Sequence, residues 1–148
     1  MGDRLYLAVS RQPIRPRALL ANDLAKRTRV DQWAEWSKIN VALNFTGPIF
    51  WPVVREPKRD LNALREAIRV LDQYLDIAEN QLAGATFLCG GDFTLADVQF
   101  GHILYRYFDI DIDRRERASL RSYYERLVAR PAYREHVMVS YDELRAFD

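Results

Sequence analysis

Apolar residues recur every three or four positions along most of this chain, which is the spacing of one face of an α-helix. Between residues 24 and 45 the apolar positions include Val30, Trp33, Ala34, Val41 and Phe45. Between residues 58 and 82 they include Leu61, Leu64, Ile68, Leu71, Leu75 and Leu82. The one short alternation of polar and apolar residues, at 109–113, fits a loop better than a strand. The pattern predicts an all-α bundle.

Prolines and glycines divide the helical stretches. Two prolines predict a linker over residues 11–19. Thr46-Gly47-Pro48 predicts the end, or a kink, of the first long helix. The apolar run after it contains Pro52, so an irregular buried connector is expected over residues 49–54. Later helices are expected at residues 114–129 and 131–138.

The most informative helix begins at Thr94. Thr94 suits an N-cap, and Asp97 three residues later can close a capping box. Phe93 and Val98 can form a hydrophobic staple around the same turn. Gly101 costs about 1 kcal/mol inside a helix, and it would allow a neighbouring helix to approach closely. Between residues 94 and 108 the helix is apolar on most sides, which is typical of the centre of a bundle. Its apolar residues include Leu95, Ala96, Val98, Phe100, Ile103, Leu104 and Tyr105.

Three short segments carry a family resemblance. They are V-D-Q-W-A-E-W at residues 30–36, F-L-C-G-G-D-F-T-L-A-D-V at 87–98 and A-R-P-A-Y-R-E-H-V at 129–137. They resemble, in the same order, the first long helix, the start of the central buried helix and the penultimate helix of the C-terminal domain of bacterial-type glutathione S-transferases. The resemblance spans roughly residues 17 to 138.

The resemblance implies about five helices around the central helix that starts at Thr94. It assigns residues 20–138 to the helical domain, residues 1–19 to the remnant of a preceding helix plus a linker, and residues 139–148 to a tail. Family enzymes carry a thioredoxin-like domain first, which holds glutathione and the residue that activates it. No βαβ pattern of that kind is visible here. No catalytic residue and no cofactor are therefore expected in the chain alone, which is expected to be inactive without that domain.

The resemblance also suggests where an electrophile would bind. In the family, the exposed side of the first long helix forms much of the hydrophobic substrate site. Carried over by position, the candidates are Ser37, Val41, Asn44 and Phe45, with Arg106 on the central helix. An apolar wall with a few orienting polar groups suits an apolar substrate. An alternative is that Val41 and Phe45 belong only to the bundle core.

Other chemistry finds little support in the sequence. Two histidines and one cysteine do not make a metal site at any usual spacing. His102 is expected to be a core histidine, and Cys89 a half-buried apolar residue. The aspartates at 109, 111 and 113 copy the start of a calcium loop, but Arg114 and Leu120 replace its glycine and glutamate.

Composition and charge argue against several other classes of function. Hydrophobic residues make up 49% of the 148, and the net charge is +1. A near-neutral chain is a poor nucleic-acid binder, and no apolar run is long enough to cross a membrane. The single cysteine fits a cytoplasmic setting. The partners expected from the resemblance are a second copy of the chain, glutathione and an apolar electrophile. The alternative is a non-catalytic helical module that binds a protein or an apolar ligand.

Overall fold

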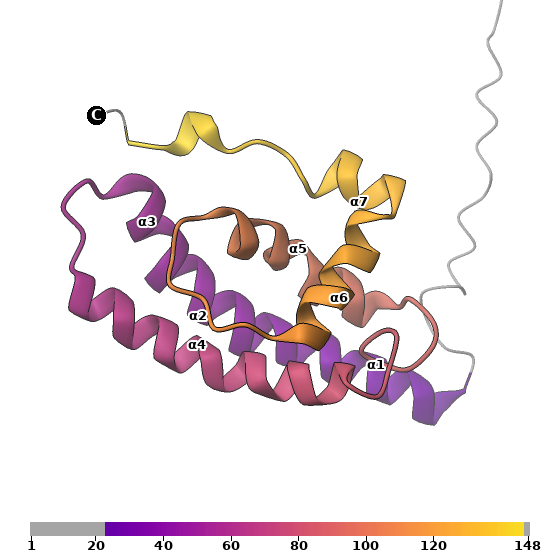
Figure 1. Cartoon of the computed structure of the whole chain (residues 1–148). Helices are drawn as coiled ribbons and strands as arrows, with labels where there is room; N and C mark the ends of the chain where they lie inside the picture. Colours follow the sequence, from indigo (N-terminus) through magenta and orange to yellow (C-terminus); the bar gives the residue numbers. More distant parts are fainter. Residues whose placement is uncertain (1–22, 147–148) are drawn as a thin grey trace, which may run out of the picture.

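The structure is a computed structural model that describes residues 23–146. The expected short helix and linker over residues 1–19 lie outside the described residues. Within the described part the chain is helical, with a single two-residue β-bridge between Phe87 and Gly90. With the stretch from Leu24 to Arg55 taken as one interrupted helix, five main helices form (Figure 1). The predicted all-α bundle is confirmed.

The first helical stretch begins with α1, Leu24–Trp36, and is capped by Asp23, whose Oδ1 accepts a hydrogen bond of 2.9 Å from Ala25 N. It continues through a π-helical segment, Ser37–Ala42, then α2, Leu43–Phe45. A second π-helical segment, Thr46–Phe50, leads into α3, Trp51–Arg55. The stretch is therefore helical throughout.

The end of the helix expected as one alternative at residues 46–48 is wrong, and so is the irregular connector at 49–54, because the chain stays helical through both. The Trp51 N–H bonds to the Thr46 carbonyl, five residues back, so the turn is wider than in an α-helix. A proline ring collides with the carbonyl four residues before it in a regular helix. The wider turn accommodates Pro48. Pro52 lies in the first turn of α3, directly after the π-helical segment.

The second long helix, α4, is Leu61–Leu82, and it is capped by Asp60, whose Oδ1 accepts from Asn62 N and Ala63 N. It lies alongside the first helical stretch (Figure 1). One face is buried, as its leucine spacing predicts. The buried residues of this face are Leu64, Leu71, Leu75, Ala78 and Leu82.

The remaining helices are α5, Leu95–Asp109, α6, Ala118–Val128, and α7, Pro131–His136. The predicted helix start at residue 114 is wrong by four residues, and residues 111–117 form a loop instead. The Arg114 guanidinium explains the loop, because it donates to the carbonyls of Phe108, Ile110 and Ile112 and so closes the end of α5.

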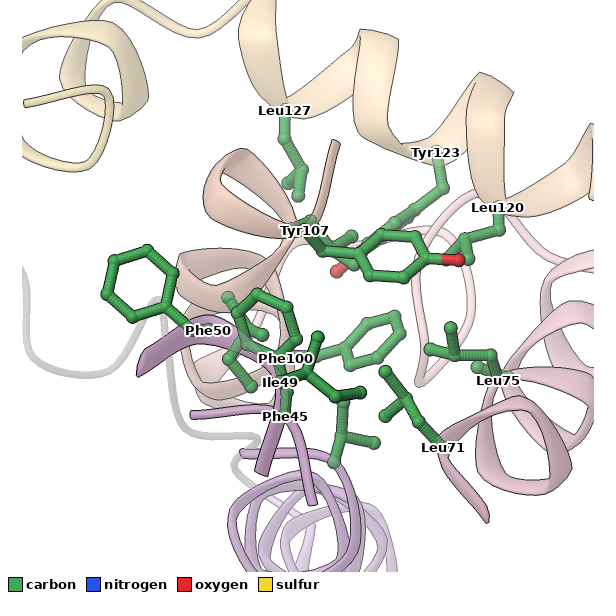
Figure 2. Close-up of a cluster of buried hydrophobic side chains, with 14 of the residues drawn as sticks. Phe45, Ile49, Phe50, Leu71, Leu75, Phe100, Tyr107, Leu120, Tyr123 and Leu127 are labelled. Atoms are coloured by element: carbon green, nitrogen blue, oxygen red, sulfur yellow. The ribbon is translucent and has the colours of Figure 1, made fainter. Parts of the chain in front are cut away.

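The core lies between α5 and its neighbours (Figure 2). It draws fully buried side chains from each long element: Phe45, Ile49, Phe50, Leu71, Leu75, Phe100, Leu120, Tyr123 and Leu127. Seven of the fifteen residues of α5 are buried and only Val98, His102 and Asp109 are exposed, as predicted for a central helix. Gly101 permits close packing, since a Cβ there would lie 2.8 Å from Leu127 Cδ1. His102 is exposed, so its assignment to the core is wrong. It lines a cavity together with residues of α7.

Candidate functional site

The five candidate residues of the substrate site fall into two groups. Ser37, Val41 and Phe45 are buried, at 0%, 1% and 1% exposure. The Ser37 hydroxyl donates 2.7 Å to the Trp33 carbonyl, which satisfies it inside the core. Asn44 and Arg106 are half-buried. These two therefore carry the polar side-chain surface of the candidate site.

Phe50 connects the two groups. Its ring centre lies 6.0 Å from that of Phe45 and 5.0 Å from the Arg106 guanidinium carbon. A guanidinium over an aromatic face is an attractive arrangement. Asn44 is held by a 2.7 Å hydrogen bond from its Nδ2 to the Asn40 carbonyl. The arrangement is an aromatic floor of Phe45 and Phe50 with the Arg106 guanidinium over the Phe50 ring.

The C-terminal segment covers part of this region. After α7 the chain runs back over the bundle towards α3 (Figure 1), and Ala146 N donates 2.9 Å to the Val54 carbonyl. Tyr141 is buried, its ring 5.2 Å from Phe50, and its hydroxyl donates to Asp109. Burial, together with the bond to Asp109, raises the pKa of Tyr141. We call residues 137–146 the C-terminal strap.

Sequence reasoning treated residues 139–148 as a polar tail and so missed the strap. The available signal was the spacing of the apolar residues Tyr141 and Leu144. This spacing does not predict packing on its own, because the partners of Tyr141, which are Phe50, Tyr105 and Asp109, lie far away in the sequence.

The start of α5 is a second organised region. Thr94 and Asp97 form a capping box, and Asp97 Oδ2 accepts from Thr94 N at 2.8 Å and from Thr94 Oγ1 at 3.1 Å. Asp97 Oδ1 accepts from Leu88 N at 3.0 Å and from the Tyr123 hydroxyl at 2.9 Å. One buried carboxylate thus joins the loop before α5, the start of α5 and helix α6.

Phe93 and Val98, the proposed staple, both line a cavity of about 220 Å³ between α5 and α7. Phe93 is half-buried and Val98 is 42% exposed. The Arg130 guanidinium carbon lies 3.9 Å from the centre of the Phe93 ring. No sequence signal indicated this cavity, because α7 supplies its other wall.

The described residues hold no cluster of three or more side chains suited to a metal ion. Cys89 is half-buried, and burial raises the pKa of its thiol, which disfavours a reactive thiolate. Among residues 23–146, no helix is both long and apolar enough to cross a membrane.

Comparison with known proteins agrees with the helical fold. The family model of the glutathione S-transferase C-terminal domain matches residues 43–131. The chain belongs to this family, and its helices are those of the C-terminal domain.

The individual proteins that this chain resembles are also glutathione S-transferases. Glutathione S-transferase GstB of Escherichia coli K12 is 26% identical over 117 residues, which cover 78% of this chain and 56% of that protein. Glutathione S-transferase F11 of Arabidopsis thaliana is 39% identical over 84 residues, covering 54% and 39%. The theta class enzyme of Xanthomonas axonopodis pv. citri, solved with glutathione bound, superposes with a TM-score of 0.78 at 34% identity, covering 83% of this chain and 65% of that one. The chain spans about half the length of the curated relatives it matches.

Proposed function

We propose that this chain forms the substrate-selecting half of a glutathione transferase. In the complete reaction the thiolate of glutathione attacks an electrophilic carbon of an apolar substrate. The helical domain supplies the wall that holds the substrate, and the groups that lower the pKa of the thiol belong to the part of the relatives that this chain does not match. The observation that carries the proposal is the family match together with the aromatic floor under Arg106.

The proposal gives the candidate residues different roles. Asn44 and Arg106 face the substrate and orient it, because they are the two candidates with polar side-chain surface. Val41 and Phe45 shape the wall from beneath, and Ser37 holds the helical turn that carries them. Substitutions of Asn44 and Arg106 should therefore act on substrate binding, whereas substitutions of the buried three should act first on stability.

Kinetics tests the proposal. The natural protein would be purified from its source cells, its intact mass measured, and its glutathione-dependent turnover of a chlorinated nitroaromatic assayed. We expect a mass well above the 17.4 kDa of this chain, and activity. In that protein Arg106→Ala should raise the KM for the electrophile several-fold and leave the KM for glutathione unchanged. Arg121→Ala, on α6 over Phe108, serves as a control that also removes an arginine from an aromatic face.

The second candidate function is a non-catalytic module that binds a protein through the first helical stretch. Ile39 and Leu43 favour it, because they lie one turn apart and are 53% and 67% exposed. Exposed apolar pairs of this kind are typical of interaction surfaces. A natural product of 17.4 kDa that binds no glutathione in calorimetry would favour this function over the transferase.

The same two residues support a homodimer, which is compatible with either function. If they form the interface, Leu43→Lys should shift the chain to a monomer in sedimentation equilibrium. Ile77→Lys is the control, because it makes a comparable change at an exposed position of α4. A general gain in solubility would affect both variants, whereas loss of the interface should affect only Leu43→Lys. If both variants and the unchanged chain have the same molecular mass in sedimentation equilibrium, Leu43 is not part of the interface.

A further inference from the structure

The cavity between the start of α5 and α7 has the features of a ligand site of its own. Its walls are largely apolar and come from Phe93 and Val98 on one side and from Ala132, Tyr133 and Val137 on the other. It shares no lining residue with the candidate electrophile site, and Val98 lies eight residues, or roughly 12 Å along a helix, from Arg106. It is therefore separate from the proposed electrophile wall, and nothing below depends on that proposal.

The charge at the rim of the cavity is positive. Arg130 lies over the Phe93 ring and forms no ion pair with any carboxylate among residues 23–146. His102 is exposed beside it and can donate a second hydrogen bond. Rim groups of this kind suit an anion, because a charge-assisted bond to a guanidinium is about twice as strong as a neutral one.

The acid that touches the cavity does not oppose an anion at the rim. Asp97 lines the cavity but is 1% exposed, and its two oxygens already accept four hydrogen bonds. The Tyr133 hydroxyl is also occupied, since it donates 2.7 Å to the Gly101 carbonyl. The interior of the cavity is thus apolar in character and the rim is cationic.

The size of the cavity limits the ligand. A volume of about 220 Å³ exceeds the roughly 150 Å³ of an engineered apolar cavity that holds benzene. It falls below the range of about 300–1,000 Å³ that is usual for drug-sized ligands. One aromatic ring with a short acidic group fits these limits. We propose that this cavity binds a small single-ring aromatic carboxylate, with the ring between Val98 and Tyr133 and the carboxylate at Arg130.

Titration of the whole 148-residue chain with benzoate, followed by ¹H–¹⁵N correlation spectra, tests the proposal. We expect saturable shift changes confined to amides of residues 93–102 and 130–137. Benzyl alcohol, which has a similar shape and no charge, should bind roughly 5- to 10-fold more weakly, in line with the strength of a charge-assisted bond. Equal binding of the two probes would overturn the assignment of Arg130. The absence of saturable changes at millimolar benzoate would overturn the site itself.

Two variants separate the site from general charge effects. Arg130→Gln should remove the preference for benzoate over benzyl alcohol. Arg134→Gln removes the same charge from the same helix outside the cavity, and it should keep the preference. Loss of the preference in both variants would show a general electrostatic effect and would contradict the proposal.

Two further variants test the cavity by filling it. Ala132→Leu places a larger side chain in the cavity and should abolish binding of both probes. Ala63→Leu, at an exposed position of α4, should leave binding unchanged. Val98→Phe fills the same cavity from α5. It should also abolish binding, and it serves as the test if Ala132→Leu does not fold. Unchanged binding in a folded cavity-filling variant would overturn the proposal.

Discussion

The Tyr123 hydroxyl donates a hydrogen bond of 2.9 Å to Asp97 Oδ1 and so ties α6 to the start of the central helix. Both residues are buried, at 0% and 1% exposure. The same Asp97 oxygen accepts from Leu88 N, while its other oxygen closes the cap with Thr94. A residue that would serve only as a helix cap in isolation therefore holds three parts of the bundle together.

Asp97→Ala should destabilise the fold by at least about 3 kcal/mol. The substitution leaves the N–H groups of Leu88 and Thr94 and the Tyr123 hydroxyl buried without an acceptor, and each such group costs about 1–3 kcal/mol. Loss of an ordinary helix cap costs only about 1 kcal/mol. Urea unfolding measures the difference. Asp92→Ala, at an exposed position in the same loop, should change stability by less than about 0.5 kcal/mol.

The environment of Tyr123 leads us to expect that the fold loses stability in alkaline solution. Burial, and then the neighbouring Asp97 carboxylate, raise the pKa of Tyr123 well above its ordinary value of about 10. Below that pH both the folded and the unfolded chain keep the proton, so the stabilisation is complete. Above it the unfolded chain loses the proton first, and stability falls by about 1.4 kcal/mol per pH unit for this group.

Urea unfolding between pH 8 and pH 11 tests whether the stability falls with rising pH as expected. Tyr123→Phe cannot ionise at this position, so its stability should fall less steeply above about pH 10. Identical alkaline slopes in the unchanged chain and in Tyr123→Phe would contradict the argument.

Gly101→Ala should destabilise the chain, although alanine is the better helix former. The gain in helix propensity is about 1 kcal/mol. The new methyl group would lie 2.8 Å from Leu127 Cδ1, so the fully buried Leu127 side chain would have to shift within the core. Overpacking of this kind costs about 1–3 kcal/mol, so we expect a net loss of about 1 kcal/mol. Gly84→Ala, where a Cβ meets nothing within 4 Å, should be neutral or slightly stabilising in the same thermal melts.

The sequence could predict those parts of the fold that depend on neighbours along the chain. The first two long helices were expected from about residues 24 and 58, and they begin at Leu24 and Leu61, where Asp23 and Asp60 cap them. The apolar surface of the segment after Thr94 likewise predicted its central place. In each case the deciding interactions lie within four residues, so the local pattern contains them.

The rest depends on contacts that are distant in sequence. Pro48 on its own indicates that the helix ends. It lies instead in a π-helical segment whose Ile49 and Phe50 are buried in the core, and those contacts cannot be read from the local sequence. Tyr141 was not predicted to pack, because its partners Phe50 and Asp109 lie 91 and 32 residues earlier. For the candidate site, the sequence named Arg106 but not the Phe50 ring beneath it.

A buried arginine before α6 gives the last prediction. The Arg117 side chain is 3% exposed and forms ion pairs of 2.8 Å with Asp72 and 2.9 Å with Asp76, both on α4. Removing one partner of a buried pair leaves uncompensated charge and typically costs 3–5 kcal/mol. Because Asp72 and Asp76 retain contact with solvent, we expect Arg117→Ala to cost somewhat less, about 2–3 kcal/mol, in urea unfolding.

Arg115→Ala is the matched control, because Arg115 also pairs with Asp76 but its side chain is 56% exposed. Exposed pairs contribute about 0–1 kcal/mol and are screened by salt. The two variants should therefore differ by more than 1 kcal/mol, and 1 M salt should remove most of the Arg115 effect and little of the Arg117 effect. Equal losses in both variants would mean that burial does not strengthen the Arg117 pairs, and that α6 is held to α4 chiefly by the Glu79 carboxylate, which accepts from Ser119 N at 2.9 Å and Leu120 N at 2.7 Å.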